Sequence, residues 1–192
     1  MRKLILASSS PYRRGLLERV VSQFEVASPD IDEQPHEGES PRQMSLRLAR
    51  EKSAHTGRRH ALDNEIVIGC DQVAALEQRP LGKPGNAANA RAQLLKCSGK
   101  QVIFYTAVCL RSSGQEKCHV DETVVTFREL TPAEIDAYIS REQPFDCAGS
   151  FKAEGLGITL FNSIRSEDPT ALIGLPLIWL CSALREMDYP LL

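Results

Sequence analysis

Short apolar runs alternate with amphipathic stretches along this chain, and the alternation predicts an α/β fold. Strands are expected at residues 4–7, 24–27, 65–76, 101–111, 118–128 and 158–161. The run at 65–76 is apolar on both faces, which is typical of a central strand. Helices are expected at about 13–21, from 40 onward, from 86 to 98, at 131–141 and from 175 onward, with capping boxes at 40 and 131. Ser113 and Gly114 are expected to join two strands as a hairpin.

The start of the first predicted helix carries a signal for anion binding. Ser10 is a suitable N-cap, and Pro11 suits the first helical position. The free N–H groups of such a helix start attract anions, and Arg13 and Arg14 add positive charge there. Arginines at this end are unfavourable for the helix alone, so the pattern favours a phosphate site. The alternative is an ordinary strand-to-helix turn with solvated arginines.

Composition narrows the function classes. The chain has 192 residues and a net charge of −2, so the whole molecule has no general attraction for nucleic acid or an acidic membrane surface. Its 42% hydrophobic and 25% charged residues are typical of a soluble globular protein. No apolar run approaches a membrane span, and the first apolar run is too short for a signal peptide. Neither nucleic acid nor a membrane is therefore expected as a partner.

The six cysteines contain no Cys-x-x-Cys pair, which argues against a zinc knuckle or a thioredoxin-like motif. Most of them lie in apolar segments and are expected to be reduced thiols of the core. The expected compartment is therefore the cytoplasm.

Several charged residues stand out because of their surroundings in the sequence. Asp71 lies inside the apolar run at 65–76, where a carboxylate is costly to bury unless it is paired or binds a metal. Lys52 falls on the apolar face of its helix, so it either extends to water or delivers an ammonium group into a cleft. Glu33 and Asp32 lie in an acidic loop, which is either solvated or a source of metal ligands. Lys83 lies in the tight loop at 81–84.

Taken together, these segments resemble the Maf family of nucleoside triphosphate pyrophosphatases over almost the whole chain. The resemblance rests on several spaced motifs: Leu-Ala-Ser-Ser-Ser-Pro-Tyr-Arg-Arg at 6–14, Asp32-Glu33, Arg50-Glu51-Lys52, Gly69-Cys70-Asp71-Gln72-Val73, Gly82-Lys83-Pro84, Ser150-Phe151-Lys152-Ala153-Glu154-Gly155 and Gly174-Leu175-Pro176-Leu177. It implies a single Maf-like domain over residues 1–192, with an inosine-triphosphatase-like α/β fold. That fold has an elongated mixed sheet with helices and two lobes around a deep cleft. The resemblance also implies cleavage of a nucleoside triphosphate between the α and β phosphates with a divalent metal.

The resemblance assigns roles to individual residues. It implies that four residues hold the phosphates, with both lysines also serving catalysis: Ser8, Arg13, Lys52 and Lys83. Glu33 and Asp71 would bind the metal and serve the attacking water, with Asp71 as the base that accepts its proton. These residue types suit the chemistry, because ammonium and guanidinium groups neutralise a triphosphate. Carboxylates are hard oxygen ligands that favour Mg²⁺ or Mn²⁺ over zinc.

Three positions resemble those of family members that hydrolyse 7-methyl-GTP: Tyr12, Gln72 and Glu154. Members that act on dTTP and UTP typically have Arg, Thr and Gln there. A physical argument agrees, because methylation at N7 makes guanine cationic, and a cation over an aromatic ring gains about 0.5–2 kcal/mol. Glu154 is suited to accept hydrogen bonds from the N1–H and N2–H edge of the base. The chain departs from this subfamily in having Tyr rather than Trp at position 12, which is a weaker cation–π partner.

The expected activity is hydrolysis of 7-methyl-GTP to 7-methyl-GMP and pyrophosphate, which clears modified nucleotides from the cytoplasmic pool. The alternatives are the same reaction on dTTP or UTP, and a nucleotide-binding regulator of cell division that acts through a protein partner. A Rossmann-type dehydrogenase lacks support, since no Gly-x-Gly-x-x-Gly follows the first strand. A thiol enzyme built on Cys70 would need a nearby histidine, which the sequence does not place. A homodimer is the candidate assembly.

Overall fold

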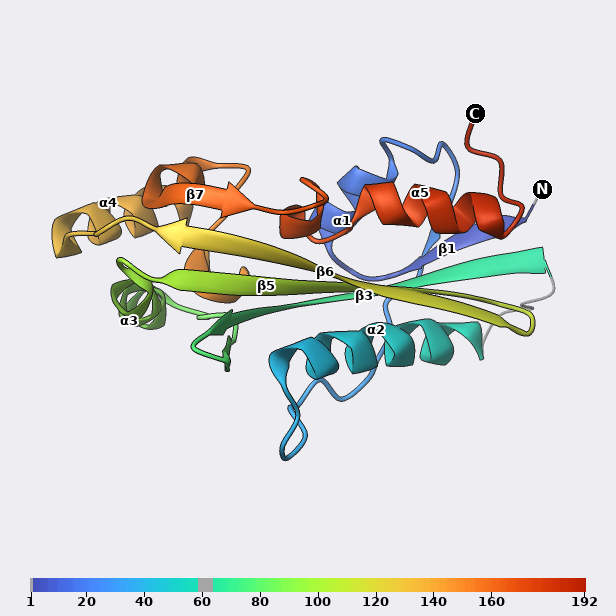
Figure 1. Cartoon of the computed structure of the whole chain (residues 1–192), viewed down its shortest axis with the longest axis horizontal. Helices are drawn as coiled ribbons and strands as arrows, with labels where there is room; N and C mark the ends of the chain where they lie inside the picture. The colour runs from blue at the N-terminus through green and yellow to red at the C-terminus, as the bar shows by residue number, and fades with distance from the viewer. Residues whose placement is uncertain (1, 59–63) are drawn as a thin grey trace.

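The computed structural model describes residues 2–58 and 64–192, which form a seven-stranded mixed sheet flanked by helices (Figure 1). The strands are β1 (Lys3–Ala7), β2 (Glu25–Val26), β3 (Glu65–Leu76), β4 (Arg79–Leu81), β5 (Gln101–Ser112), β6 (Gln115–Phe127) and β7 (Phe161–Arg165). The α-helices are α1 (Pro11–Leu17), α2 (Pro41–Gly57), α3 (Ala87–Cys97), α4 (Pro132–Glu142) and α5 (Leu177–Glu186). Short 3-10 helices follow in the C-terminal part: η2 (Ala148–Ser150), η3 (Leu156–Leu160) and η4 (Ala171–Ile173).

Three long strands run through the middle of the molecule (Figure 1). β3, β5 and β6 have 12, 12 and 13 residues, so each spans about 40 Å. The sheet order is β2-β1-β3-β5-β6-β7, with β4 also beside β3. β1 pairs in parallel with β2 and β3, and the remaining pairs are antiparallel. The sheet is therefore mixed and elongated, as expected.

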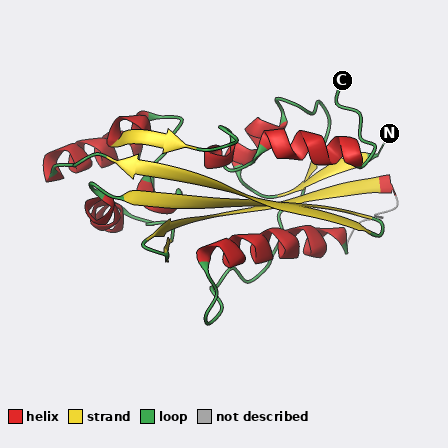
Figure 2. Ribbon diagram, in the orientation of Figure 1, coloured by secondary structure: helices red, strands yellow, loops and turns green. Residues whose placement is uncertain are grey.

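The two largest hydrophobic clusters of the described residues lie toward opposite ends of these strands. One packs the first half of β3 and the last part of β5 against β1, α1 and α5, through residues such as Leu6, Ile68 and Leu180. The other packs the end of β3 and the start of β5 against α3 and α4, through residues such as Leu94 and Phe104. Figure 2 shows the helices grouped at the two ends, with α2 below the sheet and α5 above it. The predicted two-lobed α/β architecture is confirmed.

One edge of β3 is interrupted, and the interruption lies between the two lobes. β5 pairs with one edge of β3 along nearly its whole length. On the other edge, pairing with β1 ends where Ala7 faces Gly69. Pairing with β4 covers only Ala74 to Leu76 of β3, with Leu81 opposite Ala74. Residues 70–73 of β3 therefore have neither β1 nor β4 beside them. This uncovered edge of β3 contains Asp71 and Gln72.

The close packing of α2 on β3 depends on Gly69. A Cβ atom at this position would lie 2.2 Å from the backbone oxygen of Ala49 and 2.6 Å from the backbone nitrogen of Ser53. Only glycine therefore permits this approach of the helix backbone to the strand. Lys52 lies one residue before Ser53 on α2, and Asp71 lies two residues after Gly69 on β3. The close approach consequently brings both side chains to the same place.

Most of the predicted elements are confirmed, and the differences lie in irregular segments. The capping boxes at Ser40 and Thr131 are both formed. The expected strand at 158–161 is wrong, because η3 occupies residues 156–160 and the strand starts at Phe161. Alternating apolar side chains do not distinguish a strand from a short 3-10 helix when glycines flank the segment. No helix in the described part of the chain is long and apolar enough to cross a membrane.

The expectation that the cysteines are reduced is wrong for one pair. Cys109 on β5 and Cys118 on β6 form a disulfide. The two residues face each other in the register of the hairpin, which the two-residue turn at Ser113 and Gly114 fixes. Cys70 and Cys97 are free and buried, and Cys147 and Cys181 are free and half-buried.

Candidate active site

A cleft of about 660 Å³ lies over the uncovered edge of β3. It receives residues from both lobes and from the long loop between β2 and α2. The sequence-predicted residues that line it are Ser8, Tyr12, Arg13, Glu33, Lys52, Asp71, Gln72, Lys83 and Glu154. The structure thus brings together all nine predicted site residues, although they are spread over about 150 positions of the chain.

Ser8 and Arg13 form the part of the cleft at the end of β1 and the start of α1. Arg13 donates from Nη1 to the Ser8 hydroxyl at 3.3 Å and from Nε to the Gly174 carbonyl at 3.0 Å. Ser10 caps the helix by accepting from the Arg13 backbone N–H, as predicted. Arg14 instead pairs with Glu18 at 2.9 Å on the surface of the helix. Of the two arginines, only Arg13 therefore lines the cleft.

Lys52 bridges two carboxylates in the centre of the site. Its Nζ lies 2.7 Å from Glu33 Oε1 and 2.7 Å from Asp71 Oδ1. Lys52 and Asp71 are each only 6% exposed, whereas the Glu33 side chain is exposed on the cleft side of its loop. A buried lysine and aspartate require each other, because an unpaired charge at this depth is strongly unfavourable. The interpretation that Lys52 extends to solvent is therefore wrong.

The charges of the basic residues converge on Glu33. Burial by itself would raise the pKa of Glu33, but the hydrogen bond and charge of Lys52 outweigh that effect. The charges of Lys83 and Arg13 lower the pKa further, so that the net shift is downward. We call Arg13, Lys52 and Lys83 the basic group of the cleft. Its three members lie close enough to act on the same carboxylate.

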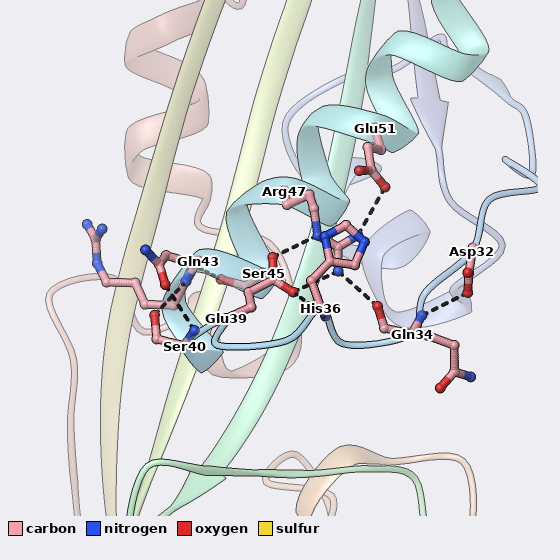
Figure 3. A network of polar contacts seen from close by, with 10 residues as sticks. Asp32, Gln34, His36, Glu39, Ser40, Gln43, Ser45, Arg47 and Glu51 are labelled. Atoms are coloured by element: carbon pink, nitrogen blue, oxygen red, sulfur yellow. Dashed lines mark hydrogen bonds and ion pairs between the residues drawn. The ribbon is translucent and has the colours of Figure 1, made fainter.

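The loop that carries Glu33 is anchored to α2 by Arg47. Figure 3 shows Arg47 extending from α2 toward this loop. Its guanidinium donates to both carboxylate oxygens of Glu39, at 2.7 and 2.8 Å, and to the Gln34 carbonyl at 3.0 Å. Asp32, which the sequence left as an alternative to Glu33, accepts from the Gln34 backbone N–H at 3.0 Å. Asp32 therefore shapes the loop and does not line the cleft.

The two predicted metal ligands offer a partial site. No cluster of three or more His, Cys, Asp and Glu side chains suited to a metal occurs among the described residues. Glu33 and Asp71 nevertheless pair with the same ammonium group, that of Lys52, so their carboxylates lie close together. Magnesium is commonly held by one or two carboxylates together with substrate phosphates and water. Two carboxylate ligands therefore suit a divalent cation that is also bound by a phosphate-bearing substrate.

Cys70 does not have the properties of a nucleophile. Its side chain is fully buried beside the site, and burial raises the pKa of the thiol to about 11. A nucleophilic cysteine must instead be partly exposed and have a lowered pKa. The thiol-enzyme alternative is therefore not supported.

A family comparison agrees with this arrangement. The family model described as Maf-like protein matches residues 3–187. The chain belongs to the Maf family.

Curated relatives of this Maf chain are similar to it over most or all of their length. A 7-methyl-GTP pyrophosphatase from Xanthomonas oryzae pv. oryzae is 53% identical over 191 residues, with 100% of both chains covered. One of the same name from Ralstonia nicotianae is 52% identical over 190 residues, covering 98% of this chain and 97% of the relative. A solved nucleoside-triphosphatase (dITP/XTP pyrophosphatase) from Mycobacterium abscessus is 19% identical, with a TM-score of 0.46 over 96% of this chain and 94% of its own.

The Maf cleft also contains an acidic group around an aromatic ring. Glu154, Asp146 and Cys147 line the cleft together with Tyr12. Burial and the neighbouring Cys147, Asp146 and Glu154 raise the pKa of Tyr12 to about 12, so the ring remains an uncharged phenol at neutral pH. Among the described residues, none donates a hydrogen bond to the Glu154 carboxylate. We call Tyr12, Asp146 and Glu154 the acidic group of the cleft.

The side-chain amide nitrogen of Gln72 contacts other residues of the protein. It donates to the Thr106 hydroxyl at 2.9 Å and to the carbonyls of Ala171 and Leu172 at 3.0 Å each. These carbonyls belong to η4, which leads directly to Gly174, the acceptor for Arg13. Gln72 therefore holds the segment that orients Arg13. Only its amide oxygen remains for a ligand in the cleft, because no described residue donates to it.

Sequence reasoning missed several residues of the Maf site. Asp146 and Cys147 line the cleft, yet they lie in a loop whose only sequence signal was its glycines. Gly174 belonged to a family motif, and the structure shows that its carbonyl orients Arg13. Arg47 had no distinguishing signal, because a charged residue on a helix surface is usually solvated.

Proposed function

We propose that this chain hydrolyses 7-methyl-GTP to 7-methyl-GMP and pyrophosphate. One observation carries the proposal: the basic group and the acidic group line the same cleft. A basic group suits a triphosphate, and an acidic group around a tyrosine suits a purine that carries a positive charge. 7-methyl-GTP combines both features in one molecule. The names of the relatives from Xanthomonas oryzae and Ralstonia nicotianae agree with this substrate.

In the proposed reaction, water attacks the α-phosphorus and the bond to the α–β bridging oxygen breaks. Asp71 accepts the proton of the water, and pyrophosphate leaves with the bridging oxygen. Arg13 and Lys83 bind the phosphates, and Lys52 stabilises the negative charge that develops on the leaving group. The contact of Arg13 with Ser8 holds the guanidinium next to the Ser8 hydroxyl, so both are oriented before the substrate binds.

A divalent cation fits this proposal at Glu33 and Asp71. When bound, Mg²⁺ or Mn²⁺ supplies positive charge to the phosphates and lowers the pKa of a bound water. Glu33 is suited to this role because the basic group lowers its pKa and keeps it ionised near neutral pH.

The base is proposed to lie against Tyr12 with its polar edge toward Glu154. Glu154 accepts no hydrogen bond from the described residues, so its carboxylate is free to accept from the N1–H and N2–H groups of guanine. Asp146 adds a second negative charge near the same ring. The positive charge of the methylated base thereby offsets the repulsion between the two carboxylates.

The deciding experiment is pyrophosphate release from 7-methyl-GTP, GTP, dTTP and UTP, each with Mg²⁺ and with Mn²⁺. We expect the highest kcat/KM for 7-methyl-GTP. Equal values for dTTP and 7-methyl-GTP would overturn the substrate assignment while leaving the pyrophosphatase reaction. Absence of hydrolysis with every nucleotide, together with tight binding to a cell-division protein, would favour the regulatory alternative.

We further propose that the protein acts in the cytoplasm, where nucleoside triphosphates are made and used. Disulfides are rare in that compartment, so the fraction of Cys109–Cys118 that is oxidised in growing cells tests the proposed location. Rapid alkylation of cell lysates followed by mass spectrometry of the peptides that contain these residues measures the fraction oxidised. A pair that is fully oxidised in the cell would argue for an oxidising compartment.

A further inference from the structure

The loop that carries Lys83 is held by two side chains of α3. Asn89 donates from Nδ2 to the Pro84 carbonyl at 2.9 Å, and Gln93 donates from Nε2 to the Gly82 carbonyl at 3.0 Å. Asn89 and Gln93 are four residues apart, so they lie on the same face of the helix. The two acceptors are the residues immediately before and after Lys83. The backbone of Lys83 is thus fixed on both sides.

Gln93 also contacts a second loop of the cleft. Its Oε1 accepts a hydrogen bond from the Ser150 hydroxyl at 2.5 Å. Ser150 is fully buried and has a positive φ of 64°, so the backbone there adopts a conformation that side chains disfavour. The contact with Gln93 is one of the interactions that can hold this conformation in place.

The second loop carries part of the acidic group. It runs from Phe145 to Ser150 and presents Asp146 and Cys147 to the cleft. A backbone hydrogen bond from Gly85 to the Phe145 carbonyl, at 3.0 Å, joins it to the Lys83 loop. A single side-chain amide, that of Gln93, therefore contacts both loops. One loop contributes to the basic group and the other contributes to the acidic group.

We propose that Gln93 is a positioning residue that sets the location of Lys83 relative to the rest of the cleft. The inference rests on the proposed function, in which Lys83 binds the phosphates of the substrate. Lys83 is exposed and forms no ion pair with the described residues, so its side chain has no support of its own. The location of its ammonium group therefore depends on the backbone of its loop, and that backbone depends on Gln93 and Asn89.

The main test compares Gln93→Met with Lys83→Met and with the double variant. Gln93→Met keeps the side-chain length and removes both hydrogen bonds. We expect it to raise KM for 7-methyl-GTP about tenfold with a smaller fall in kcat, because a phosphate contact is weakened before and during the reaction. In the Lys83→Met background, Gln93→Met is expected to have little further effect, since two residues that act through one contact are not additive.

The control is Gln101→Met, the same substitution at an exposed glutamine at the start of β5 in the same lobe. It should leave KM and kcat unchanged. A merely structural role for Gln93 would lower the amount of folded protein without changing KM, so the split between KM and kcat separates the two roles. Asn89→Ala is the second variant, because it removes only the bond to Pro84 and leaves the buried Ser150 contact intact. We expect it to raise KM severalfold.

The outcomes distinguish this inference from the proposed function. If Lys83→Met has wild-type KM and kcat, Lys83 does not bind the phosphates and this inference fails, whereas the proposed hydrolysis stands or falls with the nucleotide panel. If Lys83→Met is impaired while Gln93→Met and Asn89→Ala keep wild-type KM, the positioning role of Gln93 is wrong. Fully additive effects of Lys83→Met and Gln93→Met would also overturn it. A double variant whose KM is close to that of Lys83→Met alone would support it.

Discussion

Lys52 pairs with two carboxylates through a single ammonium group; Lys52 and Asp71 are buried, whereas Glu33 is exposed to the cleft. One positive charge between two negative ones leaves a net negative site, which would repel a triphosphate if it stood alone. Arg13 and Lys83 correct this balance, and their effect is visible in the lowered pKa of Glu33. At the scale of single residues, binding of a triphosphate therefore depends on the net charge of the site.

Asp71→Asn is expected to lower kcat by about 10²–10⁴-fold, because the amide keeps the shape of the side chain but does not accept a proton from water. Binding of 7-methyl-GTP should be largely unchanged, since Lys52 keeps an oxygen acceptor at the same place. Pyrophosphate release and isothermal titration calorimetry measure the two quantities separately. Asp136→Asn, at an exposed aspartate that pairs with Arg91 on the surface, is the matched control. Full activity of Asp71→Asn would remove Asp71 from the role of base.

Glu154→Gln is expected to reduce the preference for 7-methyl-GTP over GTP by about tenfold, because a charged acceptor facing a cationic base becomes a neutral amide. The measured quantity is the ratio of kcat/KM for the two nucleotides. Glu122→Gln, at an exposed position of β6, provides the same change outside the cleft. An unchanged ratio in Glu154→Gln would refute the proposed contact with the base edge.

At the scale of elements, α2 does most to assemble the site. It carries Lys52 on its buried face and Arg47 on the side that faces the loop of Glu33. Its distance from β3 is set by Gly69, where two backbones nearly touch. The packing of α2 at Gly69 and the ion pair of Arg47 with Glu39 can therefore be tested independently.

Gly69→Ala is expected to lower the free energy of unfolding by about 1–3 kcal/mol, because the added methyl group has backbone atoms of α2 within 2.6 Å and nowhere to move. The displaced helix should also separate Lys52 from Asp71 and reduce kcat. Chemical denaturation and steady-state kinetics give the two values. Gly15→Ala is the control, since a Cβ atom there meets nothing within 4 Å. Wild-type stability and activity of Gly69→Ala would show that the contact is readily relaxed.

The pairing of Arg47 with Glu39 predicts a pH dependence of stability. The hydrogen bond from Arg47 lowers the pKa of Glu39 from 4.5 to about 2. A lowered pKa stabilises the fold above the ordinary value of the group, and this contribution is lost as pH falls from 4.5 toward 2. The stability difference between wild type and Glu39→Gln should therefore be constant from pH 7 to about 5 and shrink below that. A difference that stays constant down to pH 3 would contradict the assignment.

At the scale of the whole molecule, the sequence predicted what depends on local signals. The helix caps at Ser10, Ser40 and Thr131 and the hairpin at Gly114 follow from backbone preferences within a few residues. The set of site residues came from the family resemblance, and the structure places those residues around one cleft. The roles of those residues remain predictions.

Features that depend on distant partners were not predictable from one sequence. The use of the Gln72 amide requires η4, which lies about 100 positions away. The double contact of Gln93 joins residues 57 positions apart. These contacts produce no periodic pattern in the sequence, because each joins segments that meet only in the folded chain.

The continuity of β3, β5 and β6 through both lobes affects how a nucleotide enters. A hinge needs a short connection that absorbs rotation, whereas here β3, which lines the cleft, is hydrogen-bonded to β5, and β5 to β6, along nearly their whole length. Swinging one lobe as a rigid body would require bending this ribbon along its whole width. The loops at the rim of the cleft must therefore move to admit substrate and release pyrophosphate. The rate of this loop movement is a candidate limit on turnover.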